Sequence, residues 1–232
     1  MNVIGVWEDI RSGFDFTALW SLLLGVIPAL VCITLHELAH GFVAYKLGDT
    51  TAKDAGRLTL NPLKHLDPMG LLMMLVFHVG WAKPVPVNMM RLKNPKRDMA
   101  LVALAGPMCN VLIAAVVFAL YGALFVPLRD NTVGQYLLDM LLLTARISIG
   151  LAIFNLIPVP PLDGSKILLS LLPDEGYRFV LRYERYGSLL LFALVALGVL
   201  SKPLSLAINA AYTALVPVAQ GAMNLVVKLF YT

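Results

Sequence analysis

The chain has 232 residues, of which 59% are apolar and 14% are charged, and its formal net charge is +4. Soluble globular proteins contain roughly 25% charged and 45–50% apolar residues, so this composition excludes a soluble fold and predicts a membrane protein. The basic residues form no stripe interleaved with aromatic residues, so they indicate no nucleic-acid partner and are typical of loops at a membrane face.

The apolar residues form a series of runs that predicts an all-α polytopic membrane protein with about five to six membrane helices. The second run has only about a dozen residues, which is too short for an ordinary span and predicts either a re-entrant segment or part of a kinked element. No internal repeat or low-complexity linker separates the runs, so residues 1–232 are expected to form a single membrane-embedded domain. In chain order, the runs cover about 16–48, 69–80, 99–126, 135–156, 186–200 and 203–229.

Two stretches between the first and third runs are predicted to be extended rather than helical. Residues 56–62 alternate polar and apolar side chains, which is the period of a strand. The sequence Lys83-Pro-Val-Pro-Val-Asn88 carries prolines that are typical of a strand edge. Extended backbone near the membrane is tolerated only where protein or a watery cavity satisfies its polar groups. We therefore expect short β or extended segments beside a polar site.

The distribution of lysine and arginine predicts how the chain is oriented in a cell membrane that it crosses several times. Residues 81–98 contain five basic residues and residues 158–185 contain four, whereas residues 127–134 contain one. Cytoplasmic loops carry an excess of lysine and arginine. The first two segments are therefore expected on the cytoplasmic side and the third on the outer side.

The first apolar run contains the sequence His36-Glu37-Leu38-Ala39-His40. On a helix, residues four positions apart lie one turn above each other, so both imidazoles can bind one metal ion. Glu37 lies between them and can accept a proton from a water molecule beside that metal. A charged side chain at membrane depth costs roughly 2.5–3.5 kcal/mol, so three ionisable residues together need a shared reason. Metal binding explains both the residue types and their spacing.

A catalytic zinc ion usually has three protein ligands and one position open to water, so a third ligand is expected elsewhere in the chain. Four residues are candidates: His65, Asp67, His78 and Asp163. Asp163 is favoured because it follows the fourth run in the sequence Asn155-Leu-Ile-Pro-Val-Pro-Pro-Leu-Asp163-Gly164. Prolines end the helix there and glycine frees the backbone, so the carboxylate can fold back to the depth of the histidines.

Together, the His-Glu-x-x-His sequence and the Asn155–Gly164 motif resemble those of the site-2 protease family of intramembrane zinc metalloproteases. Residues 55–68, 80–88 and 103–110 resemble the small prokaryotic branch, which lacks a PDZ domain. The resemblance covers roughly residues 20–200, which would form the catalytic core. It is specific because two separate motifs match in the same chain.

The resemblance implies that His36, His40 and Asp163 bind one zinc ion per chain and that Glu37 is the general base. It also implies hydrolysis of peptide bonds in membrane-spanning proteins or peptides, as in regulated intramembrane proteolysis. The cleavage would take place within the lipid bilayer, nearer the cytoplasmic face. Oligomeric state and substrate identity do not follow from it.

Two further features indicate how a substrate would be held. Asn155 is an amide at the membrane end of the fourth run, suited to holding the substrate or steadying an oxyanion; a helix-end cap is the structural alternative. A helical substrate must be unwound before cleavage. The extended segments around Leu58–Leu60 and Val85–Val87 are hypothesised to offer it a strand edge.

Two other classes of function also fit a polar site in a membrane. A metal transporter keeps ionisable residues at mid-membrane, but it has no specific need for a glutamate between two histidines. A protease-like scaffold without activity would have no use for the general base Glu37. Glu37→Gln separates these readings, because it should abolish cleavage while leaving zinc bound.

Overall fold

The structure is a computed structural model that describes residues 16–70, 82–173, 175–176, 182 and 184–231; side chains are described from residue 25 onward. The described elements are α2 (Phe16–Lys46), α3 (Thr51–Asp54), η1 (Pro62–Lys64), η2 (Met89–Arg91), α5 (Pro95–Leu128), α6 (Thr132–Asn155), α7 (Asp163–Leu171), η3 (Glu184–Tyr186), α9 (Gly187–Ala196) and α10 (Ser201–Phe230).

Among the described residues, four helices are long and apolar enough to cross a membrane: Gly25–Lys46 of α2, and the whole of α5, α6 and α10. This confirms the prediction of an all-α polytopic membrane protein. Helix α9 has ten residues and a length of about 15 Å, so it is shorter than the membrane helix expected at residues 186–200. The predicted re-entrant segment at residues 69–80 lies outside the described residues, apart from 69–70.

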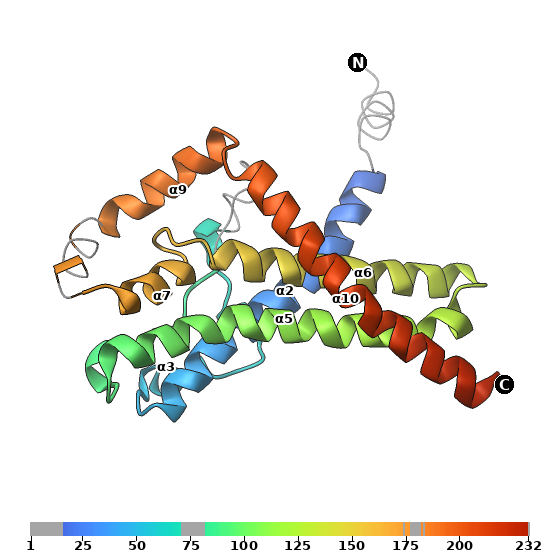
Figure 1. The fold of residues 1–232 in the computed structure, drawn as a ribbon, viewed down its shortest axis with the longest axis horizontal. Helices are drawn as coiled ribbons and strands as arrows, with labels where there is room; N and C mark the ends of the chain where they lie inside the picture. The colour runs from blue at the N-terminus through green and yellow to red at the C-terminus, as the bar shows by residue number, and fades with distance from the viewer. Residues whose placement is uncertain (1–15, 71–81, 174, 177–181, 183, 232) are drawn as a thin grey trace, which may run out of the picture.

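Helices α5 and α6 form a hairpin at the centre of the fold, and α10 crosses both of them (Figure 1). The Asn131 side chain caps α6 by accepting the backbone N–H of Gly134 at 2.7 Å. Gly134 also abuts the carbonyl group of Leu128, where a side chain would not fit. Gly122 of α5 has the same close contact with the backbone of Ala219 on α10. The apolar core between these helices is Ala114, Val117, Phe118, Ala145, Ile149 and Ala219.

The stretches that were predicted to be extended behave differently from each other. Among the described residues no strand forms, and pairing is limited to one isolated antiparallel bridge between Leu66 and Ala82. Residues 56–62 do not form the strand that their alternation predicts, because Gly56 has a φ of 62° and the chain then bends into η1. Residues 83–87 do remain without helix or turn and run alongside the functional site described below.

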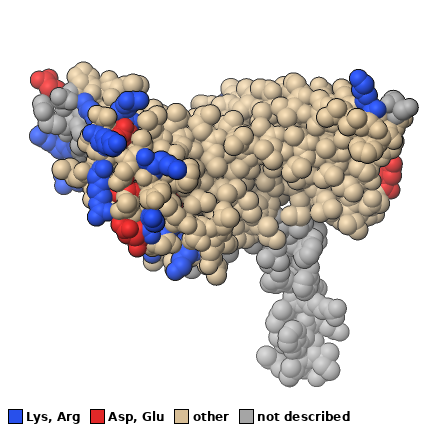
Figure 2. Space-filling view, turned by 90° about the horizontal axis from the view of Figure 1, so that it is seen from below, with Lys and Arg blue, Asp and Glu red and all other residues tan. Residues whose placement is uncertain are grey.

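Charged side chains gather at the two ends of the molecule, and most of those in view lie at one of them (Figure 2). Figure 2 shows lysine and arginine concentrated at the end that holds α3 and α7, while the broad middle of this face has none. A band without charges is what the hydrocarbon core of a bilayer requires, since a charge placed there is costly. The distribution therefore agrees with helices that cross a membrane.

Candidate metal centre

His36 and His40 lie one turn apart on α2, and their rings meet at the same point. Both residues are buried, with 5% and 8% of their surface exposed. Their Nε2 atoms are 3.0 Å apart, and the ring planes are nearly perpendicular, at 86°. The helical spacing read from the sequence thus directs two imidazole nitrogens at one buried position.

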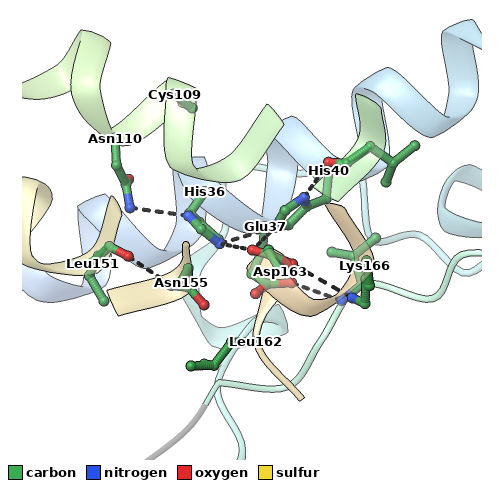
Figure 3. A network of polar contacts seen from close by, with 12 residues as sticks. His36, Glu37, His40, Cys109, Asn110, Leu151, Asn155, Leu162, Asp163 and Lys166 are labelled. Carbon is green, nitrogen blue, oxygen red and sulfur yellow. Dashed lines mark hydrogen bonds and ion pairs between the residues drawn. The ribbon is translucent and has the colours of Figure 1, made fainter. Parts of the chain in front are cut away.

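Asp163 reaches the same position from the start of α7, 127 residues further along the chain. Its Oδ2 atom is 3.2 Å from Nε2 of His36 and 3.1 Å from Nε2 of His40. The loop that follows α6 turns back sharply, and Gly164 packs directly against the backbone of Leu156, where a side chain would not fit. The structure therefore brings together the three residues whose convergence the sequence predicted (Figure 3).

The ring of His40 is arranged to bind a cation. Its Nδ1 atom is 2.7 Å from the backbone carbonyl of Val102, which can only accept a hydrogen bond, so Nδ1 carries the proton. In the neutral ring, Nε2 then directs a lone pair at Oδ2 of Asp163, which is also an acceptor. A shared cation satisfies both atoms, and nitrogen and carboxylate ligands are those that zinc takes in catalytic sites.

The ring of His36 has a comparable partner in Asn110 of α5. The side-chain amide of Asn110 lies 3.1 Å from Nδ1 of His36, and its Oδ1 atom is buried with no hydrogen bond. The two ends of an amide have the same shape. Turning the Asn110 amide by 180° lets Oδ1 accept the Nδ1–H proton, which leaves the Nε2 lone pair of His36 for a metal. Both histidines thus fit the role of metal ligand.

Two charged side chains flank this group. Glu37 directs its Oε2 atom to the backbone N–H of Val85, 2.9 Å away. Lys166, one turn after Asp163 on α7, places Nζ 3.6 Å from Oδ1 of Asp163. One oxygen of Asp163 therefore faces the histidines while the other faces a cationic side chain, which fixes the direction of the carboxylate.

Asn155, the predicted substrate-holding residue, lies at the end of α6. Its Nδ2 atom donates a hydrogen bond to the carbonyl of Leu151 at 2.9 Å, back along its own helix. In Figure 3 it lies on the side of His36 that faces α6, without a dashed contact to the three converging residues. Asn155 is the last residue of α6, and the loop that follows it leads directly to Asp163 at the start of α7.

The other candidates for a third metal ligand lie elsewhere or outside the described residues. Asp67 accepts the backbone N–H groups of Met69 and Gly70 and so caps a helical turn. His65 is 1% exposed, but its Nε2 atom lies 2.9 Å from the carbonyl of Thr59 in the loop. His78 falls outside the described residues. Of these candidates, Asp163 is the one that joins the histidine pair in the described part of the chain.

Helix α5 also contributes to the site, through Gly106 and Asn110. Gly106 lies so close to the imidazoles that a Cβ atom there would be 2.6 Å from Nε2 of His36, and closer still to Nε2 of His40. Asn110, one turn further, contacts His36. The signal was present as Gly106-Pro107-Met108-Cys109-Asn110 inside an apolar run, but the pattern alone does not tell which helix it faces.

The chain is similar to a family of peptidases and to several proteins named as zinc metalloproteases. A profile of Peptidase family M50 matches residues 122–200, which include Asn155 and Asp163. YwhC of Bacillus subtilis, provisionally named a zinc metalloprotease, is 41% identical over 175 residues, covering 73% of this chain and 78% of that protein. Rip2 of Mycolicibacterium smegmatis, with the same provisional name, is 31% identical over 178 residues, 75% of this chain and 66% of Rip2.

A more distant relative is MJ0611 of Methanocaldococcus jannaschii, also provisionally named a zinc metalloprotease, at 32% identity over 133 residues. The alignment covers 57% of this chain and 62% of that protein. No solved structure matches the chain.

Apolar spanning helices around a buried group of two histidines and a carboxylate define the class of intramembrane zinc metalloproteases. The chain belongs to Peptidase family M50, the site-2 protease family, in its small form.

Proposed function

We propose that this protein hydrolyses peptide bonds of membrane-spanning substrates. In this proposal His36, His40 and Asp163 bind the zinc ion, and Glu37 is the general base. One observation carries this proposal: three buried ligand atoms from α2 and α7 lie within 3.2 Å of one another. The groups on the far side of each imidazole support it: the Val102 carbonyl beside His40, and the Asn110 amide beside His36 once it is turned by 180°, leave both Nε2 atoms available to a metal.

The chemistry follows from the side chains around this point. When bound, zinc supplies a Lewis acid that polarises the scissile carbonyl and lowers the pKa of water toward about 7. Glu37 accepts the proton of the attacking water on its carboxylate and delivers it to the nitrogen of the leaving amine. Because the ligand residues are at most 8% exposed, little bulk water competes with these hydrogen bonds.

The substrate is proposed to pair with the extended segment at residues 83–87 after it has unwound. Pro84 and Pro86 have no N–H group, and their carbonyl oxygens accept no hydrogen bond from the described residues. This edge therefore offers acceptors to a substrate strand, which must supply the N–H donors. N-methylating substrate amides one at a time near the scissile bond should then abolish cleavage at particular positions. Uniform tolerance of N-methylation would argue against the pairing.

Cleavage is proposed to take place nearer the cytoplasmic face. The end of the molecule that carries most of the lysines and arginines in view also holds α7, which begins with Asp163 (Figures 1 and 2). Basic residues are enriched on the cytoplasmic side of membrane proteins. Cysteine labelling at Lys64 and at Arg129, from either side of intact cells, tests the orientation: Lys64 should be labelled from inside and Arg129 from outside.

The catalytic assignment is tested with purified protein in lipid vesicles that also contain a single-span substrate. We expect Glu37→Gln to bind zinc as the wild type does and to lose cleavage by about 100-fold or more, since a general base contributes roughly 10²–10⁴-fold. Glu175→Gln, the same change at an exposed glutamate, is the matched control and should retain activity. Cleavage by Glu37→Gln at the wild-type rate would refute the assignment, and zinc flux across the vesicles would favour a transporter.

A further inference from the structure

The segment Lys83–Asn88 is fixed against the helix that carries the histidines. The Val85 side chain is 8% exposed and packs beside Gly41, where a Cβ atom would lie 3.0 Å from Cγ1 of Val85. Gly41 directly follows His40 on α2. The absence of a side chain at residue 41 thus lets an extended backbone lie flush against α2, next to the metal centre.

Both ends of this segment are held by buried groups. Lys83 donates its backbone N–H to the carbonyl of His65 at 2.9 Å and accepts a hydrogen bond from Nη2 of Arg57 at 2.6 Å. At the other end, the N–H of Asn88 donates to Oδ2 of Asp49 at 2.6 Å. Arg57 is 7% exposed and Asp49 is fully buried, so water competes little with the hydrogen bonds that these two side chains make to the segment.

The two prolines determine which backbone group faces Glu37. Pro84 and Pro86 have no N–H, so Val85 supplies the single backbone donor between them. A residue before proline is confined to extended conformations, which restricts both Lys83 and Val85. The Val85 N–H therefore has a defined direction, and in that direction it meets Oε2 of Glu37 at 2.9 Å.

We propose that the backbone amide of Val85 is a positioning group for catalysis, which holds the Glu37 carboxylate in the direction needed to take a proton from water. A hydrogen bond to a carboxylate is short and strong compared with a neutral one. It engages Oε2, and no described residue donates a hydrogen bond to Oε1, which is therefore the acceptor that faces water. A general base acts only within hydrogen-bond reach of the proton that it removes. This inference rests on the proposed role of Glu37.

The direct test removes the N–H of Val85 and keeps the segment extended. Val85→Pro does this, because a third proline between two others still favours an extended backbone. Val85→Ala is the control for the lost side chain, since it keeps the N–H.

We expect Val85→Pro to lower kcat by about 10- to 100-fold with KM and zinc content unchanged, since a displacement of about 1 Å costs up to roughly 100-fold. The fall in kcat is measured against Val85→Ala, which also lacks the valine side chain but keeps the N–H. In the Glu37→Gln background, Val85→Pro should cause no further loss, because the group that it positions is gone. A kcat for Val85→Pro equal to that of Val85→Ala would overturn the inference.

A second variant covers the case in which Val85→Pro does not fold. Replacing Val85 with its α-hydroxy acid converts one backbone amide to an ester, so the N–H is lost while the valine side chain remains. The same fall in kcat is expected, and an unchanged kcat would again overturn the inference. The experiments distinguish failure of the two proposals. If the Glu37→Gln variant is active, the role of Glu37 as base is refuted. If Glu37→Gln is inactive but the ester variant keeps the wild-type kcat, only the positioning role of Val85 is refuted.

Discussion

Replacing Gly106 with alanine tests the metal centre from the helix that faces it. A Cβ atom at this position would lie 2.6 Å from both Cε1 and Nε2 of His36, and nearer still to Nε2 of His40. Non-bonded heavy atoms prefer about 3.5–4.0 Å, so the overlap is about 1 Å. Gly106 lies inside α5, where the helical backbone fixes the position of a Cβ atom, so the methyl group cannot rotate away from the histidines.

The histidines must therefore move, or α5 must shift away from α2. Overpacking of this kind typically costs about 1–3 kcal/mol, which is partly offset by the roughly 1 kcal/mol that alanine gains over glycine in a helix. Folding should thus survive in Gly106→Ala. Metal binding should not, because ligand distances must be kept within about 0.2 Å. We expect the affinity for zinc to fall by about 100-fold or more, and cleavage to be lost with it.

The assay is metal content after equilibration in chelator-buffered zinc, measured on protein in lipid together with substrate cleavage. Gly25→Ala is the matched control: it lies on α2, and a Cβ atom there meets nothing within 4 Å. It should bind zinc and cleave as the wild type does. If Gly106→Ala holds zinc with wild-type affinity, the position of the metal between the three ligand atoms is refuted.

Three further predictions follow from other contacts. Asn110→Leu should lower the affinity for zinc by about 10- to 100-fold in a zinc titration, because His36 loses the hydrogen-bond partner of its Nδ1 atom. Asn110→Asp keeps an acceptor for the Nδ1–H group of His36, so it should bind zinc more tightly than Asn110→Leu does. Asn155→Leu should lower kcat by about 100-fold if the amide steadies an oxyanion, and should change only the melting temperature if it merely caps α6. Burial raises the pKa of Asp49, but hydrogen bonds from Thr51 and from the Asn88 backbone outweigh it and lower that pKa below its ordinary value. The ionised form therefore stabilises the fold above pH about 4, and this contribution is lost as the pH falls through the lowered pKa. Asp49→Asn should cost about 2 kcal/mol in denaturant unfolding at pH 7 and progressively less below pH 4.

The helical spans could be predicted from the sequence because hydropathy is a local property. Residues 99–126 and 135–156 lie within α5 and α6, apart from one residue beyond the end of α6. The same reasoning made residues 56–62 a strand, because alternation does not reveal the positive φ of Gly56 or the turn that Asn61 caps. Nor does apolar length alone distinguish the ten-residue α9 from a complete span.

For the site, helical spacing was enough to place His36 and His40 together, and the turn residues around Asp163 indicated a chain that folds back. The contacts made by α5 were not predictable in this way. The partners Asn110 and His36 are 74 residues apart, and Val85 and Glu37 are 48 apart. Such pairs depend on how helices and loops pack, which no periodic pattern in a single sequence records.

The separation of 127 residues between His36 and Asp163 has a consequence beyond catalysis. A cation held by both residues clasps the first membrane helix to the part of the chain that follows α6, and so closes a very long loop. A ligand that binds only the folded protein stabilises it by RT ln(1 + [L]/Kd), about 4.1 kcal/mol at a thousandfold excess over Kd. Zinc bound by these two residues would therefore stabilise the tertiary structure as well as take part in catalysis, and we expect the melting temperature of the protein to rise with the logarithm of the free zinc concentration.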